Sequence, residues 1–333
     1  MQTLRVDQLV GRTVGEYQIE QLLGQGQLGM AYLARQRSQG RTVIMTMFNF
    51  PEGISARERD QITTLLDQER ATLVRLTHPT ILPVYDAGEH AGSLYLVTAF
   101  AKGASLAQVL KHQGRFTPHQ TLGVLKQVAA GLDYAHSQGV VHGILSLSNV
   151  LISDELTVQL TGFGLRTLLE VSEKRQNRQP QTYHFGPNGT FLGSPASISP
   201  ERVLDKLADA RSDIYALGVM LFELLSGTPP FRGATPLDMA LQRIQRPVPS
   251  VHAVCPDVPE ALDLVLSKTL ERDPAKRYRR AGNSAAAFER VLTLLEAAQR
   301  ATDSRTQQLA RDPQISLPPT VNWYEEAGIP SGK

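Results

Sequence analysis

The alternation of apolar and polar residues changes character along the chain. Between residues 17 and 48, apolar and polar positions alternate around a cluster of glycines, which predicts short β-strands. Residues 55–77 combine charge with helical spacing and predict a charged helix. Residues 121–139 repeat apolar residues with a helical period and predict a buried helix. At 333 residues the chain is long for one core and fits two lobes plus a tail.

Two segments lack any period. Residues 165–198 are long and polar, contain Asn-Arg-Gln-Pro and Gly-Pro-Asn-Gly, and are predicted to form a loop. The pattern stops again at about residue 299, and the polar, proline-dotted stretch 299–333 is predicted to be a tail or linker. The single tryptophan, Trp323, lies there beside Tyr324. The pair either docks on the body or on a partner, or belongs to an exposed tail.

Composition excludes several classes of protein. The formal net charge of +2 argues against a dedicated nucleic-acid binder. The single cysteine, Cys255, leaves no intrachain disulfide and fits a reducing compartment. No apolar run reaches about 18 residues, so we expect no membrane span, and the N-terminus lacks the apolar core of a signal peptide. We expect a cytoplasmic protein, or the cytoplasmic part of a longer or membrane-associated one.

A glycine-rich turn joins the first two predicted strands. Its glycines, Gly24, Gly26 and Gly29, are spaced G-x-G-x-x-G, which lets backbone N–H groups approach phosphates. A dinucleotide-binding loop would lead from a strand into a helix. A second strand follows here, which favours a hairpin. A glycine-rich turn that binds nothing remains an alternative interpretation.

The stretch from His142 to Asn149 resembles the catalytic loop of protein kinases, H-R-D-L-x-x-x-N. Further landmarks follow in the family's order, and the most faithful match is "DARSDIYALGVMLFELLSGTPPF" (209–231). The chain is thereby identified as a member of the bacterial, eukaryotic-like Ser/Thr protein kinase family. The matching positions are Gly24, Gly26, Gly29, Glu69, His142, Asn149, Phe163, Gly164, Pro200, Glu201, Asp213 and Arg277.

The resemblance covers roughly residues 17–298 and implies an α+β, two-lobed, protein-kinase-like fold. It implies an N-terminal extension (1–16), a small antiparallel β lobe with one helix (17–101), a larger mainly helical lobe (102–298) and the tail (299–333). The family's pattern also suggests roles. Asp213 would hold the catalytic-loop backbone, Arg277 would pair with Glu201, and Phe163 would pack in the core. Glu69 is either the acid of the mobile small-lobe helix or a solvated helix charge.

The departures from the family fall on the residues that touch phosphate, metal or the attacking hydroxyl. Thr46 and Ser146 replace lysines, Gly143 replaces the loop arginine, Ile144 replaces the catalytic base and Gly162 replaces the metal-binding aspartate. The first lysine in the chain is Lys102, beyond the small lobe. No Asp or Glu lies between Tyr134 and Ser153, or between Thr157 and Leu169.

We therefore expect a catalytically inactive pseudokinase that acts as a binding, scaffolding or regulatory module for an unidentified protein partner. We expect no metal, because Asn149 alone offers one neutral amide, and Mg²⁺ usually needs carboxylates and phosphates. One alternative is an enzyme with residual or altered nucleotide chemistry, with groups supplied by residues 165–198. Another is a sensor that binds ATP without metal.

One residue in the wall of the family's adenine pocket is unusual in this chain. Ile44 adds three carbons where the family has a methyl group, and it is expected to join an apolar column that fills the pocket. ATP binding would then be absent, or no tighter than about millimolar. The hinge would be Ala99, Phe100 and Ala101. The other wall positions are Leu23, Ala31, Thr98, Leu151 and Thr161.

Overall fold

The computed structural model describes residues 9–25, 29–49, 55–165, 197–204 and 208–311. Its contacts divide the chain after Glu289 into two compact units, and each is described by itself. The segment 166–196, the glycine Gly26 and the stretch 312–333 lie outside the described residues, so the predictions made for them stay predictions. Within the described part, the helices lack the combination of length and apolar character needed to span a bilayer.

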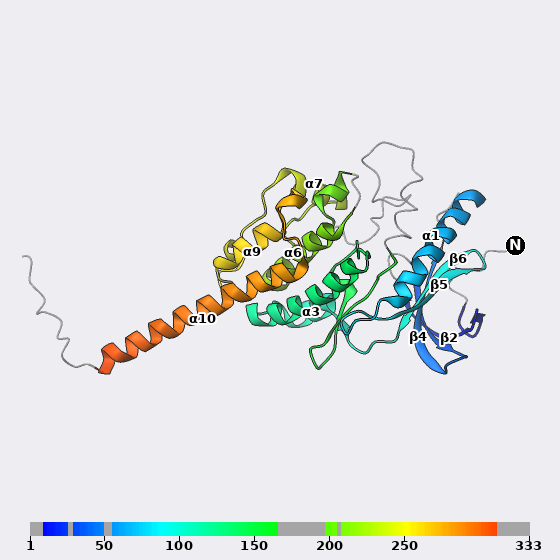
Figure 1. The fold of residues 1–333 in the computed structure, drawn as a ribbon, viewed down its shortest axis with the longest axis horizontal. Helices are drawn as coiled ribbons and strands as arrows, with labels where there is room; N and C mark the ends of the chain where they lie inside the picture. Colours follow the sequence, from blue (N-terminus) through cyan, green and yellow to red (C-terminus); the bar gives the residue numbers. More distant parts are fainter. Residues whose placement is uncertain (1–8, 26–28, 50–54, 166–196, 205–207, 312–333) are drawn as a thin grey trace, which may run out of the picture. The chain divides into compact units, whose positions relative to one another are not determined.

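The small lobe is an antiparallel sheet of six strands covered by one helix (Figure 1). The strand order is β1-β2-β3-β4-β6-β5, and helix α1 packs against β5. The glycine-rich turn joins β2 to β3, which pair antiparallel, so the predicted hairpin is confirmed. The elements are β1 (Thr13–Val14), β2 (Tyr17–Gln25), β3 (Met30–Gln36), β4 (Arg41–Asn49), α1 (Ala56–Arg75), β5 (Val84–His90) and β6 (Ser93–Ala99).

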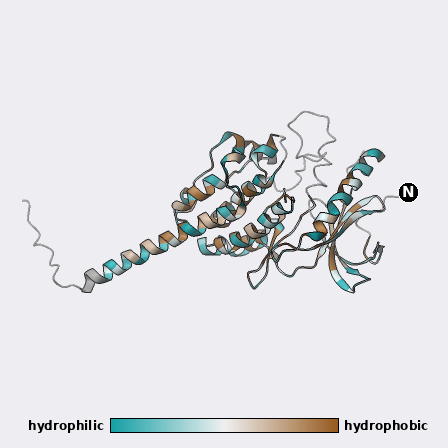
Figure 2. Cartoon of the chain, viewed as in Figure 1, coloured by the Kyte–Doolittle hydropathy of each residue, from teal (hydrophilic) through white to brown (hydrophobic). Residues whose placement is uncertain are grey.

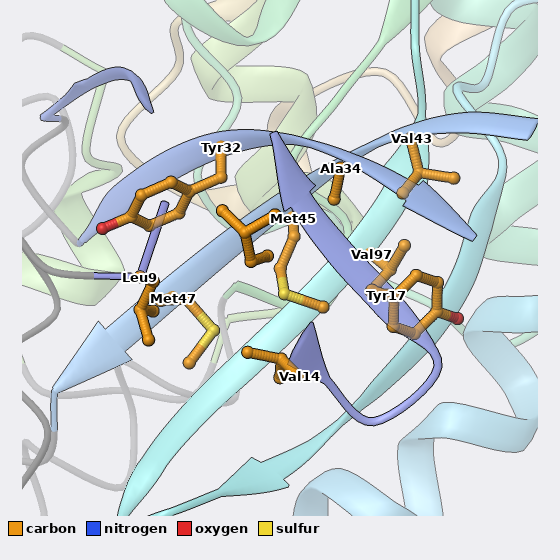
Figure 3. Close-up of a cluster of buried hydrophobic side chains, with 10 residues drawn as sticks. Leu9, Val14, Tyr17, Tyr32, Ala34, Val43, Met45, Met47 and Val97 are labelled. Atoms are coloured by element: carbon orange, nitrogen blue, oxygen red, sulfur yellow. The ribbon is translucent and has the colours of Figure 1, made fainter. Parts of the chain in front are cut away.

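Strand β4 shows why the small lobe has one buried and one partly open face. Successive side chains of a strand point to opposite faces. Val43, Met45 and Met47 are buried against Tyr17 and Tyr32 in the core drawn in Figure 3. Ile44 and Thr46 therefore point to the other face, where they remain partly buried. This is the face on which the family binds its nucleotide.

The large lobe is built around helix α6, which is buried along most of its length and contacts α3 and α9. Its start is fixed by a capping box between Asp209 and Ser212, and it ends at Gly227 in a left-handed conformation. Figure 2 shows hydrophobic and hydrophilic residues mixed along the visible helices, including α1. The helical elements are α2 (Leu106–Gln113), α3 (Pro118–Ser137), η2 (Leu147–Asn149), α5 (Pro200–Val203), α6 (Ala210–Ser226), α7 (Pro236–Gln245), α8 (Val251–Val254), α9 (Ala261–Thr269), η3 (Pro274–Lys276) and α10 (Ala281–Arg311).

A three-stranded sheet places the loops of the candidate site. Its strands are β7 (Ala104–Ser105), β8 (Val150–Ile152) and β9 (Val158–Leu160), paired in the order β7-β8-β9. The loop that resembles the catalytic loop leads into β8, and the Gly162-Phe163-Gly164 turn follows β9. Because β8 and β9 are hydrogen-bonded neighbours, the two functional segments emerge side by side.

The first part of the predicted polar tail or linker, residues 299–311, is helical. Helix α10 continues through residues 299–311 to Arg311. Once a helix is nucleated, each added residue gains a hydrogen bond, so polar residues can extend it without an apolar stripe. Side chains add local support: Gln299 Nε2 donates to Asp303 Oδ1 at 2.9 Å, and Thr302 Oγ1 donates to the Ala298 carbonyl at 3.0 Å.

Candidate functional site

The backbone of the candidate catalytic loop is held by Asp213, a completely buried residue in the first turn of α6. Its carboxylate accepts the N–H groups of His142 at 2.8 Å and Gly143 at 2.7 Å. His136, at the end of α3, places Nε2 2.7 Å from the same carboxylate. Burial alone would favour the neutral acid. The hydrogen bond from His136, the nearby histidines and the Gly143 N–H instead hold the pKa of Asp213 below its ordinary value.

His142 connects this loop to the turn after β9. Its Nε2 lies 2.9 Å from the Thr161 carbonyl, and its ring centroid lies 4.6 Å from that of Phe163. Both side chains are buried, as the sequence predicts for Phe163. Burial lowers the pKa of the His142 imidazole, so the ring is neutral at pH 7 and acts in packing and hydrogen bonding.

The single amide at the site is engaged in holding the loop. Asn149 Nδ2 donates to the Ile144 carbonyl at 2.7 Å, and the Thr161 N–H donates to the Asn149 carbonyl at 2.8 Å. Asn149 is partly buried. Its side-chain amide therefore fixes the shape of the segment that leads from Ile144 into β8.

Gly162 faces this loop from the neighbouring segment. A Cβ atom built on Gly162 would lie 3.6 Å from Asn149 Cγ, 3.6 Å from Ile144 Cδ1 and 3.5 Å from Leu165 Cδ1. The positions that would carry the base and the metal-binding aspartate are thus brought together as the sequence predicts. They present an isoleucine side chain and a glycine, which can neither take up a proton nor coordinate a cation.

The backbone at two of these positions is left-handed. Gly143 has φ 75° and Gly162 has φ 90°, a region in which a residue with a Cβ atom is strained by roughly 1–2 kcal/mol. Glycine adopts it freely. Glycine at both positions therefore avoids this backbone strain.

Replacing Gly162 by alanine is expected to lower the free energy of unfolding by about 1–2 kcal/mol, because the Cβ meets only ordinary contacts and the cost is the backbone conformation. Gly123 is the matched control. It lies exposed in α3, a Cβ there meets no atom within 4 Å, and Gly123→Ala should raise stability by about 0.5–1 kcal/mol. Urea unfolding of both variants measures the difference. Equal effects of the two changes would contradict the assigned strain.

The other predicted structural pair is formed. Arg277 donates to both oxygens of Glu201, with Nη1 at 2.8 Å and Nη2 at 2.7 Å, and Ser212 Oγ donates to Glu201 at 2.7 Å. Burial opposes ionisation of Glu201, but Arg277 and Ser212 hold the pKa of its carboxyl below the ordinary value. The pair joins α5 to the segment before α10.

The other replaced positions lie where the sequence places them. Thr46 is partly buried on β4, opposite Ala31 and Leu96. Ser146 precedes η2 and makes no side-chain cap to it. A Cβ on Gly29 would collide with the Met47 carbonyl oxygen, so close strand packing by itself requires this glycine.

Two of the positions that would form the family's nucleotide pocket are exposed. Leu23 on β2 is 47% exposed, and Phe100 of the hinge is 46% exposed. Gly24 pairs with Ala31, and Ile44 pairs with Thr98. The remaining positions, Ala31, Thr98, Ala99, Ala101, Leu151 and Thr161, are partly buried. Ile44 is partly buried on the face of β4 opposite the core of Tyr17 and Tyr32, and its filling of the adenine pocket stays a prediction.

Helix α1 is attached to the sheet by a pair that sequence reasoning missed. Glu69, the expected partner of the lost lysine, is exposed. Its neighbour Arg70 places Nε 2.7 Å from Asp86 on β5, and Asp86 also accepts from the Tyr95 hydroxyl at 3.3 Å. Burial and the Asp86 charge raise the pKa of Tyr95 to about 12. In the sequence, the only signal for this pair was an aspartate within the residues that form β5.

No metal site accompanies this arrangement in the described ranges. They contain no group of three or more His, Cys, Asp or Glu residues positioned to hold an ion. Among the family's metal-facing positions only Asn149 keeps a polar side chain, and its Nδ2 is already engaged.

Comparisons with known proteins identify the family of the fold. The family model described as the protein kinase domain matches residues 17–286. The chain is 30% identical over 289 residues to the serine/threonine-protein kinase PknH of Mycobacterium tuberculosis H37Rv, covering 86% of this chain and 44% of PknH. It is 30% identical over 271 residues to the serine/threonine-protein kinase PrkC of Bacillus subtilis, covering 81% of this chain and 40% of PrkC. The chain thus spans less than half the length of these two relatives.

A solved structure supports the fold alone. Rad53 residues 1–466, in complex with AMP-PNP, superimposes with a TM-score of 0.62 at 24% identity, covering 81% of this chain and 64% of that one. Both structures have two lobes with the predicted mixture of strands and helices. Because the family model matches residues 17–286, the chain belongs to the protein kinase domain family.

Proposed function

We propose that this chain is a pseudokinase, a protein kinase domain that serves as a binding, scaffolding or regulatory module without transferring phosphate. The observation that carries the proposal is the meeting of Ile144, Asn149 and Gly162 within ordinary contact distance. The backbone that would present a base and a metal ligand is in place, and the side chains that would act are missing.

The expected loss of rate is large. Phosphoryl transfer depends almost wholly on positioning and charge stabilisation. A missing general base costs about 10²–10⁴ in rate, and a missing preorganised charge contact costs roughly 10²–10³. Ile144 removes the first, and Gly162 and Thr46 remove charge contacts. Such losses are not additive, but each one alone is severe.

The retained contacts support a role that depends on shape. Asp213 still fixes the loop backbone, Arg277 still pairs with Glu201, and Phe163 still packs on His142. These residues stabilise the fold and take no part in chemistry. A chain that keeps this framework while losing charge at the reactive positions fits a module that binds protein partners.

Nucleotide binding tests this proposal. If ATP binds no tighter than about millimolar, 1 mM ATP stabilises by RT ln 2, about 0.4 kcal/mol. Differential scanning fluorimetry should then show a rise in Tm of about 1 °C or less, the same with and without Mg²⁺. The partly open face around Ile44 makes this measurement informative.

Two outcomes would favour the alternatives. A rise of several degrees that requires Mg²⁺ would indicate a metal–nucleotide site and an enzyme with residual chemistry. A comparable rise without Mg²⁺ would indicate a metal-independent ATP sensor. An active serine/threonine kinase measured in the same plate serves as the positive control.

A further inference from the structure

The second half of helix α10 carries an exposed apolar stripe. Every residue from 293 to 307 is exposed. Residues that are three, four and seven positions apart in a helix lie on one face. Five apolar side chains and one threonine follow this spacing, and together they are called here the α10 stripe: Val291, Leu294, Leu295, Ala298, Ala301 and Thr302. Leu294 is 63% exposed and Leu295 is 38% exposed.

The other faces of this part of α10 are polar and bonded within the helix. Arg300 lies 3.8 Å from Glu296, and Gln299 donates to Asp303 at 2.9 Å. The Ser304 hydroxyl donates to the Arg300 carbonyl at 2.8 Å. These contacts between residues four apart support the helix without a neighbour, whereas exposed leucines gain free energy only when they leave water. The α10 stripe is therefore the face of this helix that is stabilised by being covered.

The sequence that follows α10 has a complementary pattern. Residues 313–326, called here the tail segment, lie outside the described residues and read PQISLPPTVNWYEE. The stretch 299–333 has no period as a whole, but every odd-numbered position from 315 to 323 holds an apolar residue or a proline: Ile315, Leu317, Pro319, Val321 and Trp323. Alternate side chains of an extended chain share one face. The pattern therefore predicts an extended segment with one apolar side.

The tail segment is long enough to return along the α10 stripe. Pro313 cannot continue a helix, so the chain is free to turn after Arg311. Leu294 lies 17 residues before Arg311, a distance of about 26 Å along a helix. Trp323 lies 12 residues after Arg311, which spans up to about 37 Å in a polyproline conformation. The indole can therefore reach the two leucines with chain to spare.

We propose that the tail segment folds back along the α10 stripe and packs Trp323 on Leu294 and Leu295. Its apolar side replaces water over the stripe, and this burial supplies the main favourable free energy. The adjacent prolines in the tail segment restrict the free chain, which reduces the entropy lost on docking. Because the connection to the helix is short, the effective concentration of the tail segment at the stripe is high.

Charge favours the tail segment over a second copy of the chain as the occupant of the stripe. Arg305 continues the spacing of the stripe, so two stripes packed in parallel would bring like charges together. In the tail segment, residues 325 and 326 are both glutamates and come shortly after Trp323. When Trp323 lies on Leu294, these acids come near Arg290, which is exposed one helical turn earlier.

Tryptophan fluorescence of the full chain tests the proposal, because Trp323 is the only tryptophan in the sequence. Changing Leu294→Gln together with Leu295→Gln removes the apolar contact and keeps good helix formers. Docking shields about half of the indole surface, so the acrylamide quenching constant should rise about twofold in this variant. The emission maximum should move to longer wavelength. Circular dichroism checks that the variant is folded, and Leu294→Ala with Leu295→Ala should change both readouts in the same direction by less.

The matched control makes the same changes at exposed leucines of two other helices. Leu241 on α7 is 37% exposed and Leu264 on α9 is 76% exposed. The double change Leu241→Gln and Leu264→Gln should leave the quenching of Trp323 as it is in the unmutated chain. Equal quenching in the unmutated chain and the stripe variant would overturn the proposal. Protection of Trp323 that is lost on hundredfold dilution would also overturn it and would identify a second copy as the occupant. Because no nucleotide is present, the result is independent of phosphoryl transfer.

Discussion

Replacing Asp213 by alanine is expected to lower the free energy of unfolding by about 4–6 kcal/mol. The change leaves two backbone N–H groups, those of His142 and Gly143, and the His136 ring without their acceptor. Each buried donor left unsatisfied costs about 1–3 kcal/mol. Urea unfolding followed by circular dichroism measures the loss. If the alanine variant does not fold, Asp213→Asn retains one acceptor and should show an intermediate loss.

Asp257 provides the matched control. Its side chain is 85% exposed and forms an ion pair with Arg115 at 3.2 Å. Surface pairs of this kind contribute about 0–1 kcal/mol, so Asp257→Ala should change stability by less than that. If Asp213→Ala were no more destabilising than Asp257→Ala, Asp213 would not be the anchor of the catalytic-loop backbone.

Replacing Arg277 by methionine is expected to cost about 3–5 kcal/mol. Methionine keeps much of the apolar volume but removes the guanidinium, which makes five hydrogen bonds to Glu201 and three backbone carbonyls. The Glu201 carboxylate would then remain buried with Ser212 as its side-chain donor. Equilibrium unfolding in guanidinium chloride measures the effect.

Two further variants distinguish the effect of losing the buried Glu201–Arg277 pair from a general effect of removing a charge. Arg280 is 69% exposed beside Asp133, and Arg280→Met should cost about 1 kcal/mol or less. Combining Arg277→Met with Glu201→Leu removes both buried charges and should recover part of the loss. If Arg277→Met and Arg280→Met were equally mild, the Glu201–Arg277 pair would contribute little to the fold.

The sequence predicts the order and type of the main elements because their apolar periods are strong. The alternation in 17–48 becomes β2 to β4, and the periodic run 121–139 becomes most of α3. The contacts of Asp213 and Arg277 were also predictable, since the resemblance assigns a partner to each. The same resemblance predicts that Phe163 packs in the core, and its side chain is buried.

Other features depend on partners that no local pattern specifies. The third donor to Asp213, His136, lies 77 residues away in sequence, and Asp86 meets Arg70 only after the sheet has formed. The register of β4 decides which face Ile44 occupies, and whether its side chain fills the adenine pocket stays a prediction. The helical character of residues 299–311 was not predicted because polar residues hide a helix that is already nucleated.

Two glycines at the site share an unusual backbone conformation. Gly143 and Gly162 both adopt left-handed backbone, where any other residue would store strain. In the pseudokinase that we propose, glycine at these positions adds stability without a cost in activity. Loss of phosphoryl transfer and relaxation of the loop are therefore expected to accompany each other, as in other trade-offs between activity and stability.

Phosphoryl transfer itself tests the central claim most directly. The full chain is incubated with γ-labelled ATP, either Mg²⁺ or Mn²⁺ and a generic acceptor protein, beside an active serine/threonine kinase and a heat-denatured sample. We expect label in the chain and in the acceptor to equal the heat-denatured background. Stoichiometric labelling that rises in proportion to the protein concentration and is lost in Asn149→Ala would contradict the pseudokinase account.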